Sequence, residues 1–234
     1  MNNNKSSNFL HIKNIFESIS SEYDFMNDLM TFKNHSKWKK EIAEIAKYSS
    51  PKKILDIATG TGDIAINLSK INGSKIEGVD VSGNMLKIAR KKIDELKIDN
   101  IALKTCEAEN LVFEDNHFDI VSIGYGVRNF SNLEKGLSES YRVLKRDGKL
   151  IILETSVPEN RIIKLFYTII TSIYIPIIAF IFSGKTKAYL YLLDSTKKFP
   201  PKNKFIEMLY KTGFEKVETR KKLYGASTIY IISK

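Results

Sequence analysis

The chain has 234 residues, 43% of them hydrophobic and 27% charged, a composition typical of one large globular domain with a buried core. The formal net charge of +10 favours an anionic neighbour, such as acidic lipid, nucleic acid or a phosphate-rich ligand, although the basic residues form no compact run. Cys106 is the single cysteine, which excludes a disulfide within the chain and is typical of a reducing compartment. The polar start, residues 1–8, lacks the apolar core of a signal peptide, so we expect a cytoplasmic protein.

The first fifty residues have helical patterns and precede any strand-like run. One apolar helix face is spaced over residues 12–19, and a second, over His35–Tyr48, contains Trp38 and Ile42. We expect residues 1–50 to form a helical cap over a bound substrate.

Residues 51–155 alternate strand-like and helix-like runs, which predicts an α/β fold with a mostly parallel, doubly wound sheet that forms the cofactor-binding core. The expected strands lie at 53–58, 75–81, 101–105, 119–123 and 148–154, and the expected helices at 63–71, 83–96 and 133–144. Asp147-Gly148 predicts a tight turn before the fifth strand. In such sheets a ligand binds at the carboxyl ends of the strands, where the strand order reverses, so we expect the cofactor at the ends of the first two strands.

The segment Lys53–Ala65 (KILDIATGTGDIA) carries the strongest local signal, because an apolar strand stops at a glycine turn and a helix pattern follows. Gly60 and Gly62 leave the backbone bare, so that its N–H groups can approach a nucleotide-like ligand. Asp80 ends the second strand, where a carboxylate can accept hydrogen bonds from two ribose hydroxyls. The pattern predicts a cofactor that contains adenosine.

Two kinds of cofactor fit this pattern. The letters GTGDIA (Gly60–Ala65) satisfy the dinucleotide motif and favour a nicotinamide or flavin enzyme. Asp56 and Asp63 favour S-adenosylmethionine, because carboxylates repel pyrophosphate and attract an ammonium and a sulfonium group. Asp63 as a plain helix cap is compatible with either cofactor. We expect S-adenosylmethionine, with Asp56 facing its amino end.

After the fifth strand come an apolar helical insertion (156–200) and a closing segment (201–234). Leu165–Phe182 contains no charged residue and is close to the lower length limit of a membrane span. We expect Pro176 to break it into two short helices that form an apolar lid or lie on a bilayer surface, and a true span is the less favoured alternative. The closing segment predicts a helix at Lys202–Lys211 and an antiparallel pair of strands, Phe214–Lys222 and Ala226–Ser233.

Several segments resemble those of known enzymes. DIATGTGDIA with Asp80, and YRVLKRDGKL (Tyr141–Leu150), resemble the class I S-adenosylmethionine-dependent methyltransferases. Four further segments resemble, more specifically, the C-methyltransferases of menaquinone and ubiquinone biosynthesis: YDFMNDLMTFKNHSKWKK (Tyr23–Lys40), EAENLVFEDNHFD (Glu107–Asp119), GYGVRNF (Gly124–Phe130) and YLYLLDSTKKFP (Tyr189–Pro200). The resemblance implies one methyltransferase domain over 1–234, with a Rossmann-like seven-stranded sheet, an antiparallel edge pair and helices on both faces.

The resemblance also implies contacts with the cofactor at matching positions. These are Thr61, Asp80, Glu107, Ala108 and Gly124, which join Asp56, Gly60 and Gly62 from the strand and glycine-turn pattern. Glu107 is one methylene longer than the Asp or Asn usual in the family, and Gly124 replaces a frequent Ser, so that only backbone can make a contact there.

The implied reaction is methylation of a ring carbon of a reduced, prenylated quinone. The carbon becomes nucleophilic when an adjacent phenol, whose free pKa is near 10, loses its proton. The candidate catalytic residues are Tyr23, Asp24, His35, Arg128 and Asn129, and the candidate substrate contacts are Tyr23, Asn27 and Arg128.

Each catalytic candidate has an expected role and a structural alternative. Arg128 is expected to stabilise the phenolate and Asn129 to orient a hydroxyl or a water, while Asp24 or His35 accepts the proton. The alternatives are that Arg128 pairs with a structural carboxylate, that His35 caps a helix and that Tyr23 packs in the helical cap. No group of His, Cys and Asp residues has metal-ligand spacing, so we expect no metal.

A prenylated substrate needs an apolar surface or a bilayer beside the active site for its tail, and the apolar insertion could provide that surface. With Lys164, Lys185 and Lys187 beside it, the insertion suits peripheral contact with the inner face of a membrane, and a homodimer interface is the alternative. Two other functions compete: a nicotinamide oxidoreductase, and a nucleic-acid methyltransferase or RNA-binding protein based on the net charge. The sequence lacks an aromatic-basic stripe, so we expect no nucleic acid. We favour the menaquinone branch over the ubiquinone branch, although no residue decides between them.

Overall fold

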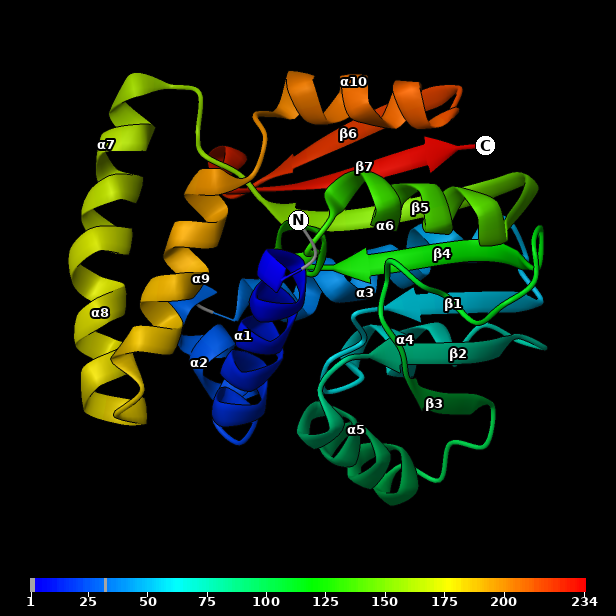
Figure 1. Ribbon diagram of the computed structural model, residues 1–234, viewed down its shortest axis with the longest axis horizontal. Helices are drawn as coiled ribbons and strands as arrows, with labels where there is room; N and C mark the ends of the chain where they lie inside the picture. Colours follow the sequence, from blue (N-terminus) through cyan, green and yellow to red (C-terminus); the bar gives the residue numbers. More distant parts are fainter. Residues whose placement is uncertain (1–2, 32) are drawn as a thin grey trace.

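A seven-stranded sheet forms the centre of the protein, and the computed structural model describes residues 3–31 and 33–234 around it (Figure 1). The strand order is β3-β2-β1-β4-β5-β7-β6, and β7 runs antiparallel to both of its neighbours. The strands are β1 (Lys53–Ile57), β2 (Lys75–Asp80), β3 (Ile101–Thr105), β4 (Phe118–Gly124), β5 (Leu144–Thr155), β6 (Lys216–Lys222) and β7 (Ser227–Ser233). This order and the antiparallel edge pair confirm the predicted fold class.

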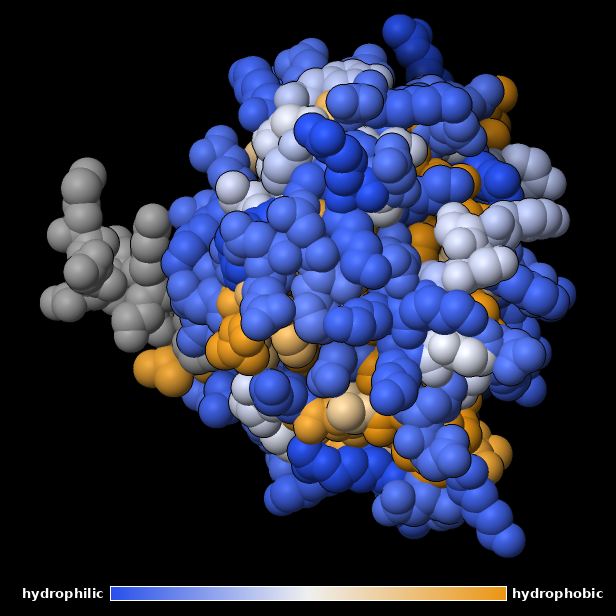
Figure 2. All heavy atoms as spheres, turned by 90° about the vertical axis from the view of Figure 1, so that its right-hand side faces the viewer, coloured by the Kyte–Doolittle hydropathy of each residue, from blue (hydrophilic) through white to orange (hydrophobic). Residues whose placement is uncertain are grey.

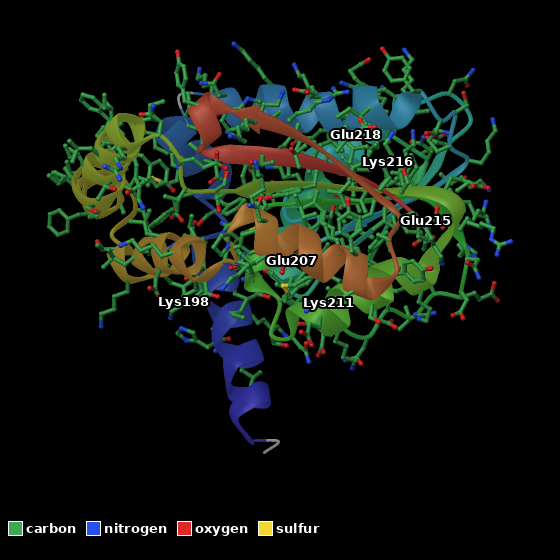
Figure 3. All side chains as sticks on the ribbon, turned by 90° about the horizontal axis from the view of Figure 1, so that it is seen from above. Lys198, Glu207, Lys211, Glu215, Lys216 and Glu218 are labelled. Carbon is green, nitrogen blue, oxygen red and sulfur yellow. The ribbon has the colours of Figure 1, made fainter. Side chains whose placement is uncertain are left out.

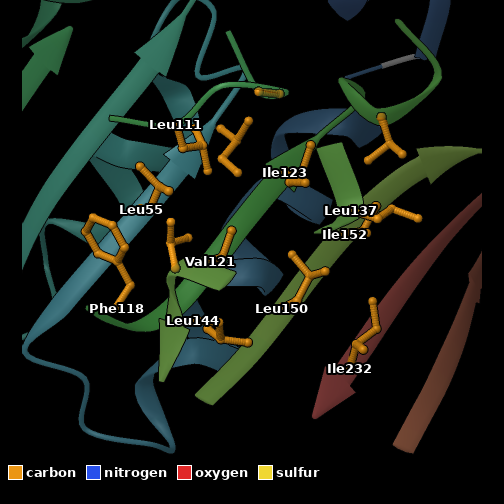
Figure 4. Packing of buried hydrophobic residues seen from close by; sticks show 14 of the residues in the cluster. Leu55, Leu111, Phe118, Val121, Ile123, Leu137, Leu144, Leu150, Ile152 and Ile232 are labelled. Atoms are coloured by element: carbon orange, nitrogen blue, oxygen red, sulfur yellow. The ribbon is translucent and has the colours of Figure 1, made fainter. Parts of the chain in front are cut away.

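Side chains alternate between the two faces of the sheet, so the central strands contribute to two separate cores. Leu55 belongs to the core under α6 and α10, where Leu137 packs (Figure 4). Ile54 belongs to the opposite core, which contains Ile42 of α3. Because both faces are covered, the central strands are apolar along most of their length. The helices against the sheet are α3 (Asn34–Lys47), α4 (Asp63–Leu68), α5 (Gly83–Glu95), α6 (Leu133–Val143) and α10 (Lys202–Thr212).

The β5 strand begins at Leu144, four residues earlier than the sequence predicts. Its pairing with β4 shifts register at a bulge that contains Asp147, whose φ of 66° is left-handed. The turn signal at Asp147-Gly148 therefore marks a bulge inside the strand and not a loop before it.

Two N-terminal helices, α1 (Asn3–Ile19) and α2 (Tyr23–Thr31), lie beyond the carboxyl ends of the parallel strands, to which the arrowheads of β1 and β4 point in Figure 1. Ile19 and Met26 are fully buried in a third cluster with Tyr189 of α9 (Thr186–Lys198). The start of the chain and the insertion after β5 therefore pack together at the ligand-binding edge of the sheet.

The insertion contradicts the expected break at Pro176. The helix is continuous from Arg161 to Ser183 and consists of α7 (Arg161–Ile169) and α8 (Ile175–Ile178), each followed by a wider π-type turn. Pro176 lies in the first turn of α8, directly after one π-type turn, where the altered hydrogen-bond pattern accommodates a residue without an N–H. The chain reverses instead at Gly184, whose φ is 64°.

The exposed apolar side chains of this helix are concentrated on one side of the molecule. They are Ile162, Leu165, Phe166, Ile169, Ile170, Ile173, Ile177, Phe180, Ile181 and Phe182. By contrast, the face at the amino ends of the parallel strands is mostly hydrophilic (Figure 2). Along α10 and β6, acidic and basic side chains are interspersed, as in the ion pair of Lys216 with Glu218 at 2.8 Å (Figure 3).

Candidate active site

A first cavity opens at the carboxyl ends of the central strands, under α1 and α2. It is lined by Ile12, Phe16, Tyr23, Ile57, Ala58, Gly60, Asp80, Val81, Met85, Cys106, Ala108, Glu109, Gly124, Tyr125, Gly126, Asn129, Phe130 and Ser131. Four of the predicted cofactor contacts therefore meet here, namely Gly60, Asp80, Ala108 and Gly124. Their loops follow β1, β2, β3 and β4, as the rule for ligand sites on parallel sheets requires.

Asp80 and the glycine loop are joined by backbone hydrogen bonds. The Asp80 carboxylate accepts from the N–H of Gly60 and from the N–H of Ser82, each at 2.8 Å. Gly60 has a left-handed φ of 57°, which a residue without a Cβ adopts at little cost. Burial raises the pKa of Asp80, and the backbone donors oppose that shift. The loop thus holds a carboxylate on the wall of the cavity, within reach of a ribose.

Asp56 does not line this cavity, in contrast to the expectation that it faces the amino end of the cofactor. Its side chain is buried, and its two oxygens accept hydrogen bonds from the Ser122 hydroxyl at 2.6 Å and the Thr59 hydroxyl at 2.7 Å. Burial raises the pKa of Asp56 to about 6, although these two hydroxyls lower it. The carboxylate therefore ties β1 to β4 beneath the glycine loop.

Three further predicted contacts lie away from the cavity wall. The Thr61 hydroxyl donates to Asp24 at 2.7 Å, and Glu107 accepts from the Asn110 amide at 3.0 Å. A Cβ added at Gly62 would lie 3.0 Å from the Cβ of Ala89, so this glycine permits close packing of α4 against α5.

The charge of the first cavity distinguishes between the two kinds of cofactor. Among the described residues, the charged side chains on its wall are Asp80 and Glu109, both acidic. The Oδ1 atom of Asn129 is buried there, has no hydrogen-bond partner among the residues that the structure describes, and can accept from an ammonium group. A cationic ligand such as S-adenosylmethionine fits these groups, whereas a pyrophosphate would face two carboxylates. The sequence argument against a dinucleotide was therefore right in its conclusion, but Asp80 and Glu109 support it, not Asp56 and Asp63.

A second cavity lies beside the first, between α2, α3, α7, α9 and the loop after β4. It is lined by Tyr23, Asn27, Thr31, His35, Trp38, Tyr125, Arg128, Thr155, Tyr167, Ile170, Thr171, Ile175, Tyr189, Leu192, Leu193, Leu223, Ala226 and Ser227. Tyr23 and Tyr125 line both cavities and so stand at the boundary between them. A cofactor in one cavity and an apolar substrate in the other would meet at these two rings.

Arg128 is held by a buried carboxylate. Its Nη1 lies 2.6 Å from Oε1 of Glu154, and its Nε donates to the Ser195 hydroxyl at 3.2 Å. Its side chain is 7% exposed and that of Glu154 is fully buried. Within the described chain, Nη2 of Arg128 has no hydrogen-bond partner and remains available to a ligand in the second cavity. Arg128 thus pairs with a structural carboxylate, as one interpretation of the sequence holds, and it also lines the second cavity, where its action on a phenolate stays a prediction.

The other catalytic candidates separate. Tyr23, Asn27 and His35 line the second cavity, whereas Asn129 lies on the first. Asp24 lines neither cavity, because Lys92 binds its carboxylate at 2.6 Å and Thr61 donates to it. This pairing leaves Asp24 poorly placed to accept a substrate proton.

Sequence reasoning missed three residues of the site: Tyr125, Glu154 and Glu109. Tyr125 lies in the motif GYGVRNF between two glycines, with a left-handed φ of 57° that its neighbours alone do not reveal. Glu154 lies at the carboxyl end of β5 and Glu109 in the loop after β3, and the signal that could have identified them is a carboxylate at or just beyond the carboxyl end of a strand. In residues 3–31 and 33–234, no group of three or more His, Cys, Asp and Glu side chains could hold a metal ion.

Comparison with known proteins agrees with this geometry. The model of the ubiE/COQ5 methyltransferase family matches residues 1–234. The demethylmenaquinone methyltransferase of Chlorobaculum parvum is 39% identical over 227 residues, which cover 95% of this chain and 92% of that protein. The ubiquinone/menaquinone biosynthesis C-methyltransferase UbiE of Rickettsia prowazekii is 39% identical over 226 residues, covering 94% and 90%. The fold resembles that of a crystallised methyltransferase from Methanococcus maripaludis, with a TM-score of 0.62, 21% identity and coverage of 94% and 91%.

Proposed function

The chain belongs to the ubiE/COQ5 methyltransferase family, and we propose that its substrate is a prenylated quinol, most specifically demethylmenaquinol. It is an S-adenosylmethionine-dependent C-methyltransferase of quinone biosynthesis, as the family match indicates. A relative named for the menaquinone branch and one named for both branches are each 39% identical to it. We favour the menaquinone branch, with methylation of the ubiquinone-branch quinol as the alternative.

The observation that carries the proposal is the pair of adjoining cavities. The first has acidic side chains and a free amide oxygen, and the second is mostly apolar, with an arginine and a histidine on its wall. An apolar ring that bears a hydroxyl fits the second cavity, because the aromatic walls exclude water and Arg128 offers a free N–H to the oxygen.

The residues of the two cavities would have different roles in the reaction. S-adenosylmethionine supplies a methyl group activated by its sulfonium, so the chain's own task is to bind, orient and deprotonate. Asp80 and the loop at Gly60 would hold the ribose, and Asn129 the amino group. Tyr23 and Tyr125 would hold the ring carbon in line with the methyl group, and such alignment contributes several kcal/mol to catalysis.

The test is a methyl-transfer assay with purified protein, a methyl-labelled donor and reduced demethylmenaquinone beside its ubiquinone-branch counterpart. We expect label in methylated quinol with both rings, and a higher kcat/KM with the menaquinone precursor. Transfer to neither quinol would refute the proposal, and a preference for the other ring would reassign the branch. Titration with S-adenosylmethionine and NAD completes the test, since tight binding of NAD alone would favour an oxidoreductase.

We also propose that the helix Arg161–Ser183 lies on the cytoplasmic surface of a membrane. It is long and apolar enough to span one by length and composition, and 17% of its most apolar window is buried. The same helix supplies Tyr167 and Ile175 to the second cavity, so that a prenyl tail could extend from the cavity into lipid. Lys164 and Lys187 are exposed beside the apolar residues and suit anionic headgroups.

Co-sedimentation with vesicles of phosphatidylglycerol and phosphatidylcholine tests this contact. We expect the parent to bind and the double variant Phe166→Ser, Phe180→Ser to lose most of its binding, because both rings are more than 60% exposed on the helix. Leu96→Ser, which removes an exposed leucine from the end of α5, is the matched control and should bind like the parent. A protein that forms a dimer and ignores lipid would assign the apolar face to a homodimer interface.

A further inference from the structure

The second cavity contains one side chain suited to take a proton near neutral pH. Its described walls carry no carboxylate, and burial raises the pKa of its tyrosines Tyr125, Tyr167 and Tyr189. Asp24, the other candidate from the sequence, is bound by Lys92 and Thr61. His35 remains, 3% exposed at the start of α3 and on the cavity wall.

The hydrogen bonds around Thr31 decide which ring nitrogen of His35 carries the proton. The Thr31 hydroxyl has a single hydrogen, and it donates this to the carbonyl oxygen of Asn27 at 2.7 Å. The same oxygen accepts from the backbone N–H of His35 at 3.3 Å and lies 3.0 Å from Nδ1. Because the hydrogen is already used, the oxygen must accept from Nδ1 as well. We therefore assign the proton to Nδ1 and the free lone pair to Nε2.

We propose that Nε2 of His35 is the general base that accepts the hydroxyl proton of the quinol. This inference rests on the proposed function, because it requires a phenol in the second cavity. Nε2 has no hydrogen-bond partner within the described residues, while Nδ1 is anchored to Thr31. Asp28 lies close on the same side of the ring, with its Oδ1 3.6 Å from Nδ1, so its charge favours the protonated imidazole without a direct hydrogen bond.

The proton and electron balance of the step is simple. The O–H bond of the quinol breaks, an N–H bond forms at Nε2, and the electron pair left on oxygen is delocalised onto the ring carbon. That carbon forms a bond to the methyl group, and the electron pair of the broken S–C bond stays on sulfur. The ring carbon then loses its own hydrogen as a proton while the oxygen regains one, so one proton is released in total.

The charges around His35 suit this role. Burial lowers the pKa of His35, and so does the nearby Lys39, while Asp28, Asp63 and Asp24 raise it. The net direction is downward, so the imidazole is neutral at pH 7 and able to accept a proton. Once it is charged, Asp28 and the Thr31 hydroxyl stabilise it. The other titratable or charged groups that line the same cavity are Tyr23, Tyr125, Arg128, Tyr167 and Tyr189, of which Arg128 is available to the phenolate oxygen.

The experiment compares His35→Ala and His35→Gln with the parent in kcat as a function of pH, with S-adenosylmethionine affinity measured alongside. We expect kcat to fall about 100-fold or more in both variants, with donor affinity within about twofold of the parent, because a general base typically contributes 10²–10⁴-fold. In the parent, kcat should fall as pH drops through the lowered pKa of His35, and this acidic limb should vanish in the variants. Added imidazole should restore part of the rate to His35→Ala. The Gln variant fills the buried volume and serves as the second test if the Ala variant does not fold.

Two controls separate chemistry from folding. His117→Ala changes a histidine at the far end of β4 and should keep the parent rate. Thr31→Val removes the hydroxyl that fixes the tautomer and should lower kcat, whereas Thr31→Ser keeps the hydroxyl and should recover it. A parent-like kcat and an unchanged acidic limb in the His35 variants would refute His35 as the general base and would leave the proposed function standing. A parent that methylates neither quinol would overturn the proposed function and the base with it.

Discussion

The buried pair of Arg128 and Glu154 gives a quantitative test of what stabilises the wall of the second cavity. Glu154 accepts four hydrogen bonds, from Nη1 and the backbone N–H of Arg128 and from the backbone N–H and hydroxyl of Thr155, at 2.6 to 3.2 Å. With Glu154 fully buried and Arg128 7% exposed, removal of either partner leaves a charge in a poorly solvated site.

The magnitude follows from this burial. Breaking a buried pair from one side costs about 3–5 kcal/mol, so we expect Arg128→Met and Glu154→Gln each to lower the free energy of unfolding by about that amount. The Gln variant should lie near the lower end, because its amide oxygen still accepts from Thr155. Since a domain of this kind is stable by about 5–15 kcal/mol, either change is a large fraction of the total. The double variant contains no unpaired charge, so its loss should be at least about 2 kcal/mol smaller than the sum of the two single losses.

The assay is a double-mutant cycle of the four proteins in urea, followed by circular dichroism and by tryptophan fluorescence from Trp38. Coincident transitions would justify a two-state treatment. Losses that add within about 0.5 kcal/mol, or a Glu154→Gln variant as stable as the parent, would refute the view that these charges depend on each other.

Three further predictions concern the cofactor side. Burial raises the pKa of Asp63, but Lys39 and Lys92 lower it to about 2. The stability that the Asp63 carboxylate contributes is therefore present above pH 4 and is lost as pH falls toward 2. The difference in unfolding free energy between the parent and Asp63→Asn should shrink from pH 5 to pH 3. The pKa of Asp56 is shifted in the opposite direction, because its native value of about 6 exceeds the ordinary 3.8. Its ionisation therefore lowers the stability of the fold as pH rises from 4 to 6. Asp56→Asn should be more stable than the parent at pH 8 by about 1–3 kcal/mol. A Cβ at Gly124 would collide with the end of the Ile64 side chain, so Gly124→Ser should lower the Tm at a cost of about 1–3 kcal/mol. Ile64 is itself buried, so Ile64→Ala also lowers the Tm, but Gly124→Ser should cost less in that background than in the parent.

Much of the first cavity could be predicted from local patterns. The glycine turn at Gly60 and the carboxylate at the end of the next strand were both predicted correctly. Each depends only on neighbouring residues, because turn conformation and the end of a strand are short-range properties. Ala108 and Gly124 were identified through resemblance and lie on the same wall. Asp56 was misplaced, because the direction of a side chain at a strand end depends on whether a neighbouring strand offers it hydroxyl partners, as Ser122 does.

The substrate side depended more on the tertiary structure. The sequence offered Asp24 and His35 as alternative bases. In the structure they differ because Asp24 is paired with Lys92, which lies 68 residues away in the chain. Similarly, Asn129 and Arg128 are adjacent in the chain but line different cavities. Sequence periodicity cannot predict which cavity each side chain lines, because this depends on the directions of two successive side chains in a short 3₁₀ turn.

The sequence by itself determined the fold class, the cofactor and the family, since these depend on alternating apolar runs, a glycine turn and segments that occur together in the chain. Only the tertiary structure decided which carboxylates are free, where the helix of the insertion ends and that Nδ1 of His35 contacts Thr31. The physical reason is that ionisable side chains take their properties from burial and from charged partners. Those partners come together at the strand ends only after distant segments have folded around the sheet.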